Sequence, residues 1–177
     1  METITAAMLT ATVLVTSVAV FIYASYSWIK GASHVMAESD SALAVQTMDR
    51  QLREAISVTL DANGKGITYQ LPAHNADGSY AVPQVWDNVT RRIALSGTNL
   101  VMSGSDGTTT TLARSVYPYD PLAGTQSAYT IFSVTSGAKV TTLNVMIVTS
   151  QLDGHQSLVT SRSRQTVYLR NLPQVAH

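Results

Sequence analysis

The chain has 177 residues, with 11 Lys and Arg against 11 Asp and Glu, so its formal charge at pH 7 is zero. Only 12% of the residues are charged and 45% are hydrophobic, which excludes a long charged disordered tail and the basic surface typical of nucleic-acid-binding proteins. The absence of cysteine excludes disulfides, cysteine-ligated metals and thiol catalysis. The length is that of one domain with an appendage.

The first element is an apolar segment near the N-terminus. Residues 3–29 contain no charged residue, no histidine, no glycine and no proline. At 1.5 Å per residue such a helix measures roughly 40 Å, enough to cross a bilayer. Tyr23, Tyr26 and Trp28 gather at its far end, where aromatic rings favour the headgroup layer. We therefore expect residues 1–30 to form a transmembrane or filament-core helix, whose orientation is left open by the charges that follow it.

The next segment has the pattern of an amphipathic helix. Residues 32–58 contain neither glycine nor proline. Apolar side chains recur at steps of three and four, as one helical face requires. The predicted stripe that packs on the rest of the protein consists of Val45, Met48, Leu52 and Ile56.

This helix is expected to end shortly before a cluster of turn residues. Asn63, Gly64 and Gly66 interrupt the pattern, so residues 31–60 are expected to continue the first helix without a break. Asp49 and Arg53 are spaced to form an ion pair four residues apart on the helix surface.

After residue 66 the sequence changes to short β-rich runs separated by turn residues, which indicates an antiparallel sheet. The expected strands are residues 66–71, 81–87, 92–96, 99–103, 108–116, 129–136, 140–149 and 158–169. The expected turns are residues 96–98, 105–107, 136–137 and 153–154, with a longer loop at 117–124. The predicted fold class is therefore α+β, with a long N-terminal helix packed on an antiparallel β-rich domain of residues 61–177.

Two local motifs accompany this layout. Residues 48–55, MDRQLREA, are similar to a Leu-x-Arg-Asp-Leu-Arg-x-Ala pattern, and residues 166–171, TVYLRN, look like a closing strand that ends in Arg-Asn. Both motifs and the layout resemble the type IV pilin superfamily, which includes minor pilins and the pseudopilins of type II secretion. The resemblance extends over nearly the whole chain in layout.

The resemblance implies a structural subunit with no enzymatic activity and no cofactor. Such a subunit lies in the inner membrane and then assembles with other copies of itself or with other pilins into an extracellular or periplasmic filament, which serves cell adhesion or protein secretion. A singly anchored envelope protein whose β-rich domain binds a partner as a monomer is the alternative. Neither hypothesis involves nucleic acid, in keeping with the neutral charge.

The N-terminus departs from the family pattern. The family has a glutamate at the fifth mature position, where this chain has Thr5. If Met1 is the mature first residue, its amine corresponds to the methylated terminus of the family. Glu2 then either contacts the amino terminus of a neighbouring subunit or lies in the headgroup layer, since a carboxylate in hydrocarbon is costly unless it is paired.

Small side chains in the span could form a helix interface. Ala7 with Ala11 and Thr12 with Thr16 are pairs at four-residue spacing, which permits close approach of a second helix. The alternative is that these residues have no specific role, because small residues are common in membrane helices.

Candidate catalytic or metal sites are not evident. The four histidines are dispersed along the chain without the spacing of a zinc site. Asp106, Asp120 and Asp153 stand in predicted turns, where an aspartate more often caps the backbone than binds calcium.

Overall fold

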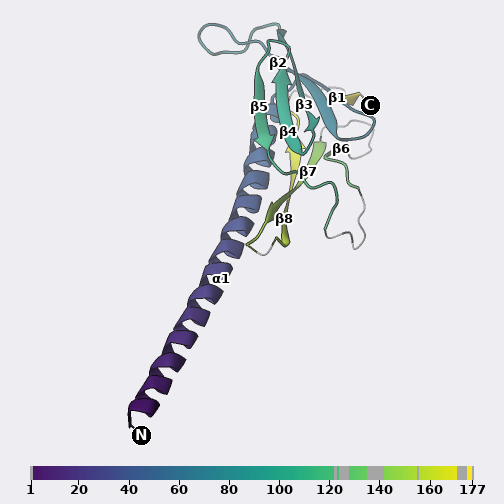
Figure 1. Cartoon of the computed structure of the whole chain (residues 1–177). Helices are drawn as coiled ribbons and strands as arrows, with labels where there is room; N and C mark the ends of the chain where they lie inside the picture. The colour runs from purple at the N-terminus through teal and green to yellow at the C-terminus, as the bar shows by residue number, and fades with distance from the viewer. Residues whose placement is uncertain are drawn as a thin grey trace.

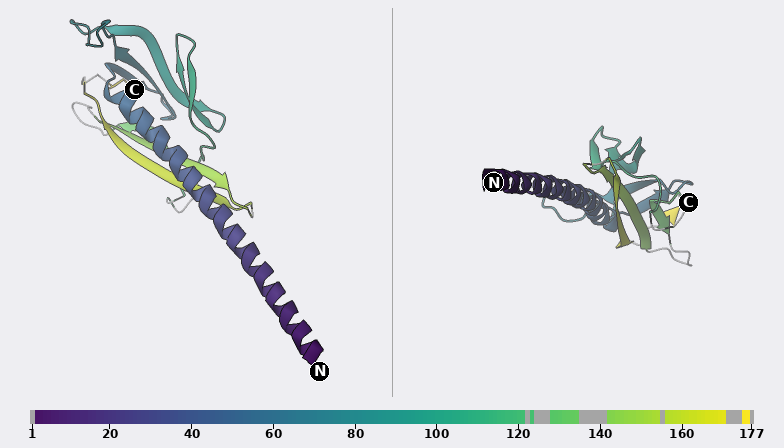
Figure 2. Two further views of the ribbon diagram at one scale, coloured as in Figure 1. Left: turned by 90° about the vertical axis from the view of Figure 1, so that its left-hand side faces the viewer. Right: turned by 60° about the horizontal axis from the view of Figure 1, so that its bottom comes forward.

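The computed structural model consists of one long helix and two β-sheets (Figure 1). It describes residues 2–121, 123, 128–134, 142–154, 156–170 and 175–176. Helix α1 (Glu2–Arg53) is continuous over 52 residues, roughly 78 Å at 1.5 Å per residue. Its N-terminal half projects well beyond the sheets, and its C-terminal half lies against them (Figure 2). The predicted α+β fold class is confirmed.

The larger sheet has six strands in the order β5-β4-β3-β2-β1-β9. Five of them form an antiparallel meander, and β9 pairs with β1 in parallel. Its strands are β1 (Ser57–Leu60), β2 (Gly66–Pro72), β3 (Trp86–Ser96), β4 (Asn99–Gly104), β5 (Thr109–Ala113) and β9 (Val175–Ala176). The smaller antiparallel sheet, in the order β6-β7-β8, consists of β6 (Phe132–Val134), β7 (Thr142–Leu152) and β8 (Leu158–Tyr168).

The expected end of the helix near residue 60 is wrong. Helix α1 ends at Arg53, and residues 57–60 form β1 instead. Val58 and Leu60 are buried on alternate positions of this strand, and Val58 is paired with Tyr69 of β2. The sheet therefore satisfies the backbone groups of these residues and buries both side chains on one face, whereas residues two apart lie on nearly opposite sides of a helix.

Two other expected strands differ from the structure. Of residues 81–87, only Trp86 and Asp87 belong to a strand, because Pro83 in this segment has no N–H to donate to a ladder. The preceding residues form an arm, 73–85, with a single bridge between His74 and Tyr80. The expected strand 108–116 ends at Ala113.

The remaining expectations for strands and turns agree more closely. The expected strand 92–96 begins earlier, at Trp86. The expected strand 129–136 is shorter at its start, because residues 129–131 belong to no strand and β6 begins at Phe132; residues 135–136 lie outside the described residues. The turns at 96–98, 105–107 and 153–154 join neighbouring strands, whereas the expected turn at 136–137 lies outside the described residues. Within the described ranges α1 is the only helix, as the sequence indicated.

The hydrophobic core lies where α1 meets the two sheets. Helix α1 contacts β7, β8 and β5. The largest fully buried side chains come from the helix and from both sheets: Met48, Leu52, Tyr69, Ile67, Ile93, Phe132, Leu143 and Ile147. The sheets are linked directly, because the N–H of Phe132 donates to the carbonyl oxygen of Gly64 at 2.9 Å. Gly64 has a φ of 62°, a conformation that favours glycine.

Candidate assembly surface on the long helix

One face of α1 is buried against the sheets from Ser33 onwards. The buried positions are Ser33, Ala37, Ser41, Ala44, Val45, Met48 and Leu52. Three of the four residues of the predicted stripe, Val45, Met48 and Leu52, lie on this face. Ile56, the fourth, follows the end of the helix and is half-buried, so it is not part of the helical stripe.

The first turns of this face consist of small residues that the hydrophobic pattern did not reveal. The Thr149 hydroxyl donates to the carbonyl oxygen of Ala37 at 2.6 Å, and the hydroxyls of Ser41 and Ser163 are 2.8 Å apart. The short side chains let β7 and β8 approach the helix backbone closely enough for these bonds. Recurrence of small residues at four-residue steps, in Ser33, Ala37 and Ser41, is the signal that could have identified this face.

The N-terminal half of α1 projects away from the sheets (Figure 2). The side chains of residues 2–31 are exposed, with Ser25 half-buried. The structure has one helix that is long and apolar enough to cross a membrane, and this is α1. Glu2 is its first described residue, and the carbonyl oxygen of Glu2 accepts a hydrogen bond from the Thr5 hydroxyl at 2.8 Å. Met1 lies outside the described residues.

The predicted small-residue pairs are all on the exposed surface of this half. Ala7 and Ala11 are one turn apart, as are Thr12 and Thr16. The hydroxyl of Thr12 donates to the carbonyl oxygen of Met8 at 2.8 Å, and that of Thr16 donates to the carbonyl oxygen of Thr12 at 2.9 Å. Because the helix itself satisfies these hydroxyls, they present mainly methyl groups to lipid or to another helix.

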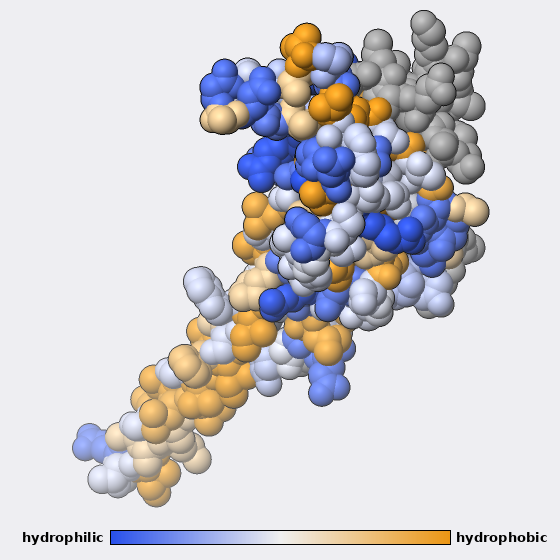
Figure 3. Space-filling model, turned by 90° about the horizontal axis from the view of Figure 1, so that it is seen from above, coloured by the Kyte–Doolittle hydropathy of each residue, from blue (hydrophilic) through white to orange (hydrophobic). Residues whose placement is uncertain are grey.

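The apolar surface of the helix continues beyond the span, on the side away from the sheets. Val35, Met36 and Leu43 are 65%, 60% and 57% exposed. At about 100° of rotation per residue, Val35 points about 160° away from the buried Ala37. We call these three residues the outer helix face. Figure 3 shows that hydrophobic residues cover the projecting part of the molecule.

A shallow groove joins the outer helix face to the span. Its volume is about 790 Å³, and its lining residues are Tyr23, Ala24, Ser27, Trp28, Gly31, Ala32, Val35 and Met36. A Cβ added at Gly31 would meet no atom within 4 Å, so the backbone is open to a partner at this point. Small residues beneath larger ones give a surface on which a second helix can pack.

The two motifs that carried the family resemblance meet at the C-terminal end of α1. The N–H of Arg170 donates to the carbonyl oxygen of Arg53 at 2.9 Å. Arg53 also forms the expected ion pair with Asp49, with 2.5 Å between Nη2 and Oδ2. A polar groove of about 410 Å³ is lined by Gln46, Thr47, Asp49, Arg50, Arg53, Glu54 and Arg170. The segment 48–55 thus helps to attach the end of the helix to the end of β8.

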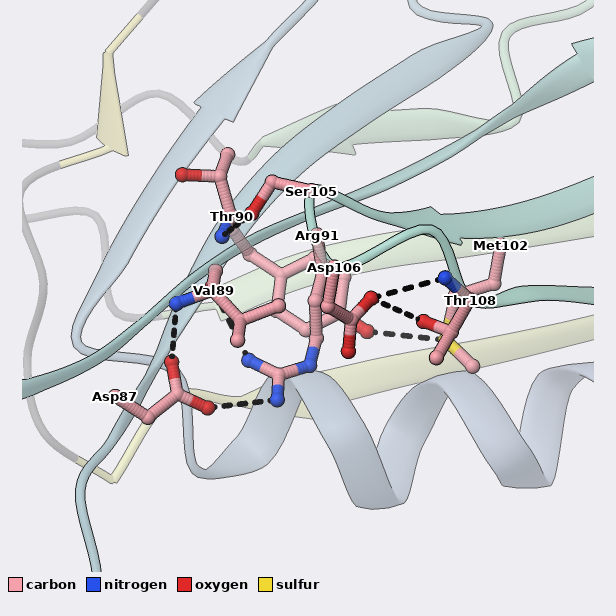
Figure 4. A network of polar contacts seen from close by, with 9 residues as sticks. Asp87, Val89, Thr90, Arg91, Met102, Ser105, Asp106 and Thr108 are labelled. Carbon is pink, nitrogen blue, oxygen red and sulfur yellow. Dashed lines mark hydrogen bonds and ion pairs between the residues drawn. The ribbon is translucent and has the colours of Figure 1, made fainter.

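A polar network connects β3 with its neighbours in the larger sheet (Figure 4). Arg91 forms an ion pair with Asp87, with 2.6 Å between Nη2 and Oδ2, and the Tyr69 hydroxyl donates to Sδ of Met102 at 3.2 Å. Burial raises the pKa of Tyr69 to about 12, although nearby Arg91 opposes the shift. Burial also acts to raise the pKa of Asp87, but hydrogen bonds from Arg91 and Val89 outweigh it and leave this pKa below its usual value.

The three turn aspartates have local partners. One carboxylate oxygen of Asp106 accepts hydrogen bonds from the N–H and the hydroxyl of Thr108, which lower the pKa of Asp106. Asp120 forms an ion pair with Arg162 at 3.1 Å. Asp153 accepts a hydrogen bond from the N–H of Ser157 at 2.8 Å. Across the described ranges there is no group of three histidine, aspartate or glutamate residues that could hold a metal ion.

The chain matches no family model, no curated protein and no solved structure.

Proposed function

We propose that this protein is a structural subunit of a type IV pilus-like or type II secretion-like filament. In such a filament the apolar halves of α1 from many subunits pack together and the sheet domains form the outer surface. The observation that supports this function best is the outer helix face, which continues the apolar surface of the span past Lys30 and alongside the sheets.

A membrane anchor alone does not account for this surface. A span of about 20 residues crosses the hydrocarbon core, and residues 3–29 already exceed that length. Leu43 lies fourteen residues after Ile29, roughly 21 Å further along the helix, where lipid no longer covers it. Helices of other subunits would cover both the span and the outer helix face in one continuous contact.

Assembly then replaces one apolar environment with another. Before assembly the span lies in the inner membrane, in contact with lipid. During assembly lipid contacts are exchanged for contacts with the helices of other copies or of other pilins, and the small residues Ala7, Ala11, Thr12 and Thr16 allow these helices to approach closely. The buried face of α1 stays with its own sheets throughout, because hydrogen bonds and core packing hold it there.

The test is the double variant Val35→Ser with Leu43→Ser. Both side chains are exposed and lie outside the span, so the variant should fold and insert normally but lose most of its sheared-filament yield. Val82→Ser is the matched control, since Val82 is an even more exposed apolar residue on the arm. Unchanged filament yield from the double variant would contradict the proposal. If the unmodified protein forms no filaments and stays monomeric in the membrane, the alternative of a singly anchored binding protein is favoured.

A further inference from the structure

The hairpin of β7 and β8 reaches further toward the N-terminal half of α1 than the rest of the strands (Figures 1 and 2). Its turn is fixed to the helix at the end of the apolar span. The Ser33 hydroxyl donates to the carbonyl oxygen of Leu152 at 3.2 Å. A Cβ added at Gly154 would lie 3.1 Å from Cγ2 of Ile29, so the turn is already in close contact with that side chain. These two contacts hold the described part of the hairpin beside the end of the span.

Two exposed leucines mark the end of this hairpin. Leu152 and Leu158 are 62% and 47% exposed, and they are direct partners in the antiparallel register, so their side chains lie on the same face. Because side chains alternate along a strand, Leu152 points to the face opposite Thr149, whose hydroxyl bonds to the helix. The leucines are therefore directed away from α1 and are not covered by the core.

The position of the hairpin end along α1 corresponds to the headgroup layer of a bilayer. If residues 3–29 are centred in the membrane, Ile29 lies about 20 Å from the midplane, or about 18 Å at a tilt of 20°. The hydrocarbon core extends about 15 Å from the midplane, and the headgroup layer extends to about 20 to 22 Å. The hairpin end is thus placed in the headgroup layer, within a side-chain length of the acyl chains.

We propose that Leu152 and Leu158 insert into the membrane interface and dock the sheet domain on the lipid surface before assembly. The inference rests on the membrane-anchored stage of the proposed function. Asp153 and Lys30 limit the depth, because both belong in the headgroup layer, and at that depth the leucines lie within a side-chain length of the acyl chains. The Asp153 carboxylate is turned into its own loop by the hydrogen bond from Ser157. A docked domain has a fixed orientation relative to the membrane when the next subunit meets it.

The experiment uses the full chain, which has no native cysteine, so that a single added cysteine carries the only label. The variants Leu158→Cys, Thr166→Cys and Val13→Cys each receive an environment-sensitive fluorophore. Thr166 is the matched control, because it is exposed on the same face of β8, eight residues or roughly 26 Å away from Leu158. The proteins are reconstituted at low density in vesicles of phosphatidylcholine and phosphatidylglycerol, with bromine at shallow or deep acyl positions as the quencher.

The label at Leu158→Cys should be quenched several-fold more by shallow bromine than the label at Thr166→Cys, while Val13→Cys should be quenched by deep bromine. Equal quenching at residues 158 and 166, with Val13→Cys still quenched, would overturn the docking inference alone. Absence of quenching at Val13→Cys would overturn the membrane stage and the docking together. If the fluorophore at residue 158 is shielded from water only when the protein density in the vesicles is raised, a second copy and not lipid covers the leucines. That result would also overturn the inference.

Discussion

Shortening Leu52 to alanine is the most direct perturbation of the contact between the helix and the sheets. Leu52 is fully buried in the core and lies in the last turn of α1, beside the junction of Arg53 with Arg170. Removal of a buried leucine side chain beyond Cβ costs 2 to 5 kcal/mol in comparable cores, depending on how far the surroundings collapse. We expect a loss of about 3 kcal/mol, and therefore a melting temperature lower by about 10 °C for a domain of this size.

The assay must report on the sheets, because α1 in a micelle keeps most of its helical signal when the sheets unfold. Urea unfolding of the full chain in mild detergent, followed by the fluorescence of Trp86 in a Trp28→Phe background, meets this requirement, since Trp86 begins β3. Leu43→Ala is the matched control on the same helix, and its exposed side chain should change the stability by less than about 0.5 kcal/mol. Equal effects of the two variants would refute the assignment of the buried face.

Ala37→Leu should destabilise the sheet domain by about 1 to 3 kcal/mol, because a larger side chain would separate α1 from β7 and break the Thr149 bond; urea unfolding measures this, and an unchanged midpoint would contradict the close approach. Because the pKa of Tyr69 is raised in the folded protein, its contribution to the free energy of unfolding is complete below pH 10 and falls by about 2 kcal/mol between pH 10 and about 12. Tyr69→Phe should therefore unfold less readily in alkali than the unmodified protein. Asp87 has a lowered pKa, so its contribution to the free energy of unfolding is present above about pH 4 and is lost as the pH falls further. Asp87→Asn should lower the free energy of unfolding by about 1 kcal/mol at pH 6, and an equal loss at pH 2.5 would exclude the ion pair with Arg91 as its cause.

The elements with a strong hydrophobic period could be predicted from the sequence, and those that depend on distant partners could not. Val45, Met48 and Leu52 recur at helical steps, and they lie on the buried face. Residues 57–60 follow the helical stripe with no glycine or proline in between, so a continued helix was expected there, and only the pairing of β1 with β2 makes this segment a strand.

Of the candidate assembly surface on α1, only the apolar span could be predicted from the sequence. The span is evident from the composition of residues 3–29. Ser33 and Ser41 gave no hydrophobic signal, because a buried hydroxyl cannot be told from an exposed one until its partner is known, and only their four-residue spacing with Ala37 marks this face. The outer helix face was equally hidden, since exposed Val35 and Leu43 have the composition of core residues, and only the placement of the sheets shows which side of the helix they occupy.

The bond between Thr149 and Ala37 joins positions that are 112 residues apart in the chain. At synthesis rates of about 5 to 20 residues per second, roughly 6 to 22 s pass between the production of the two partners. The apolar span ends at Ile29 and is thus complete by the time that interval begins, so it is exposed while the buried face of α1 still has no sheet to cover it. Strand β9 follows later still in the chain, so it can pair with β1 only after the other described strands have been produced. If the span anchors the protein as proposed, this order places membrane insertion before folding, and the sheet domain completes its fold beside the bilayer.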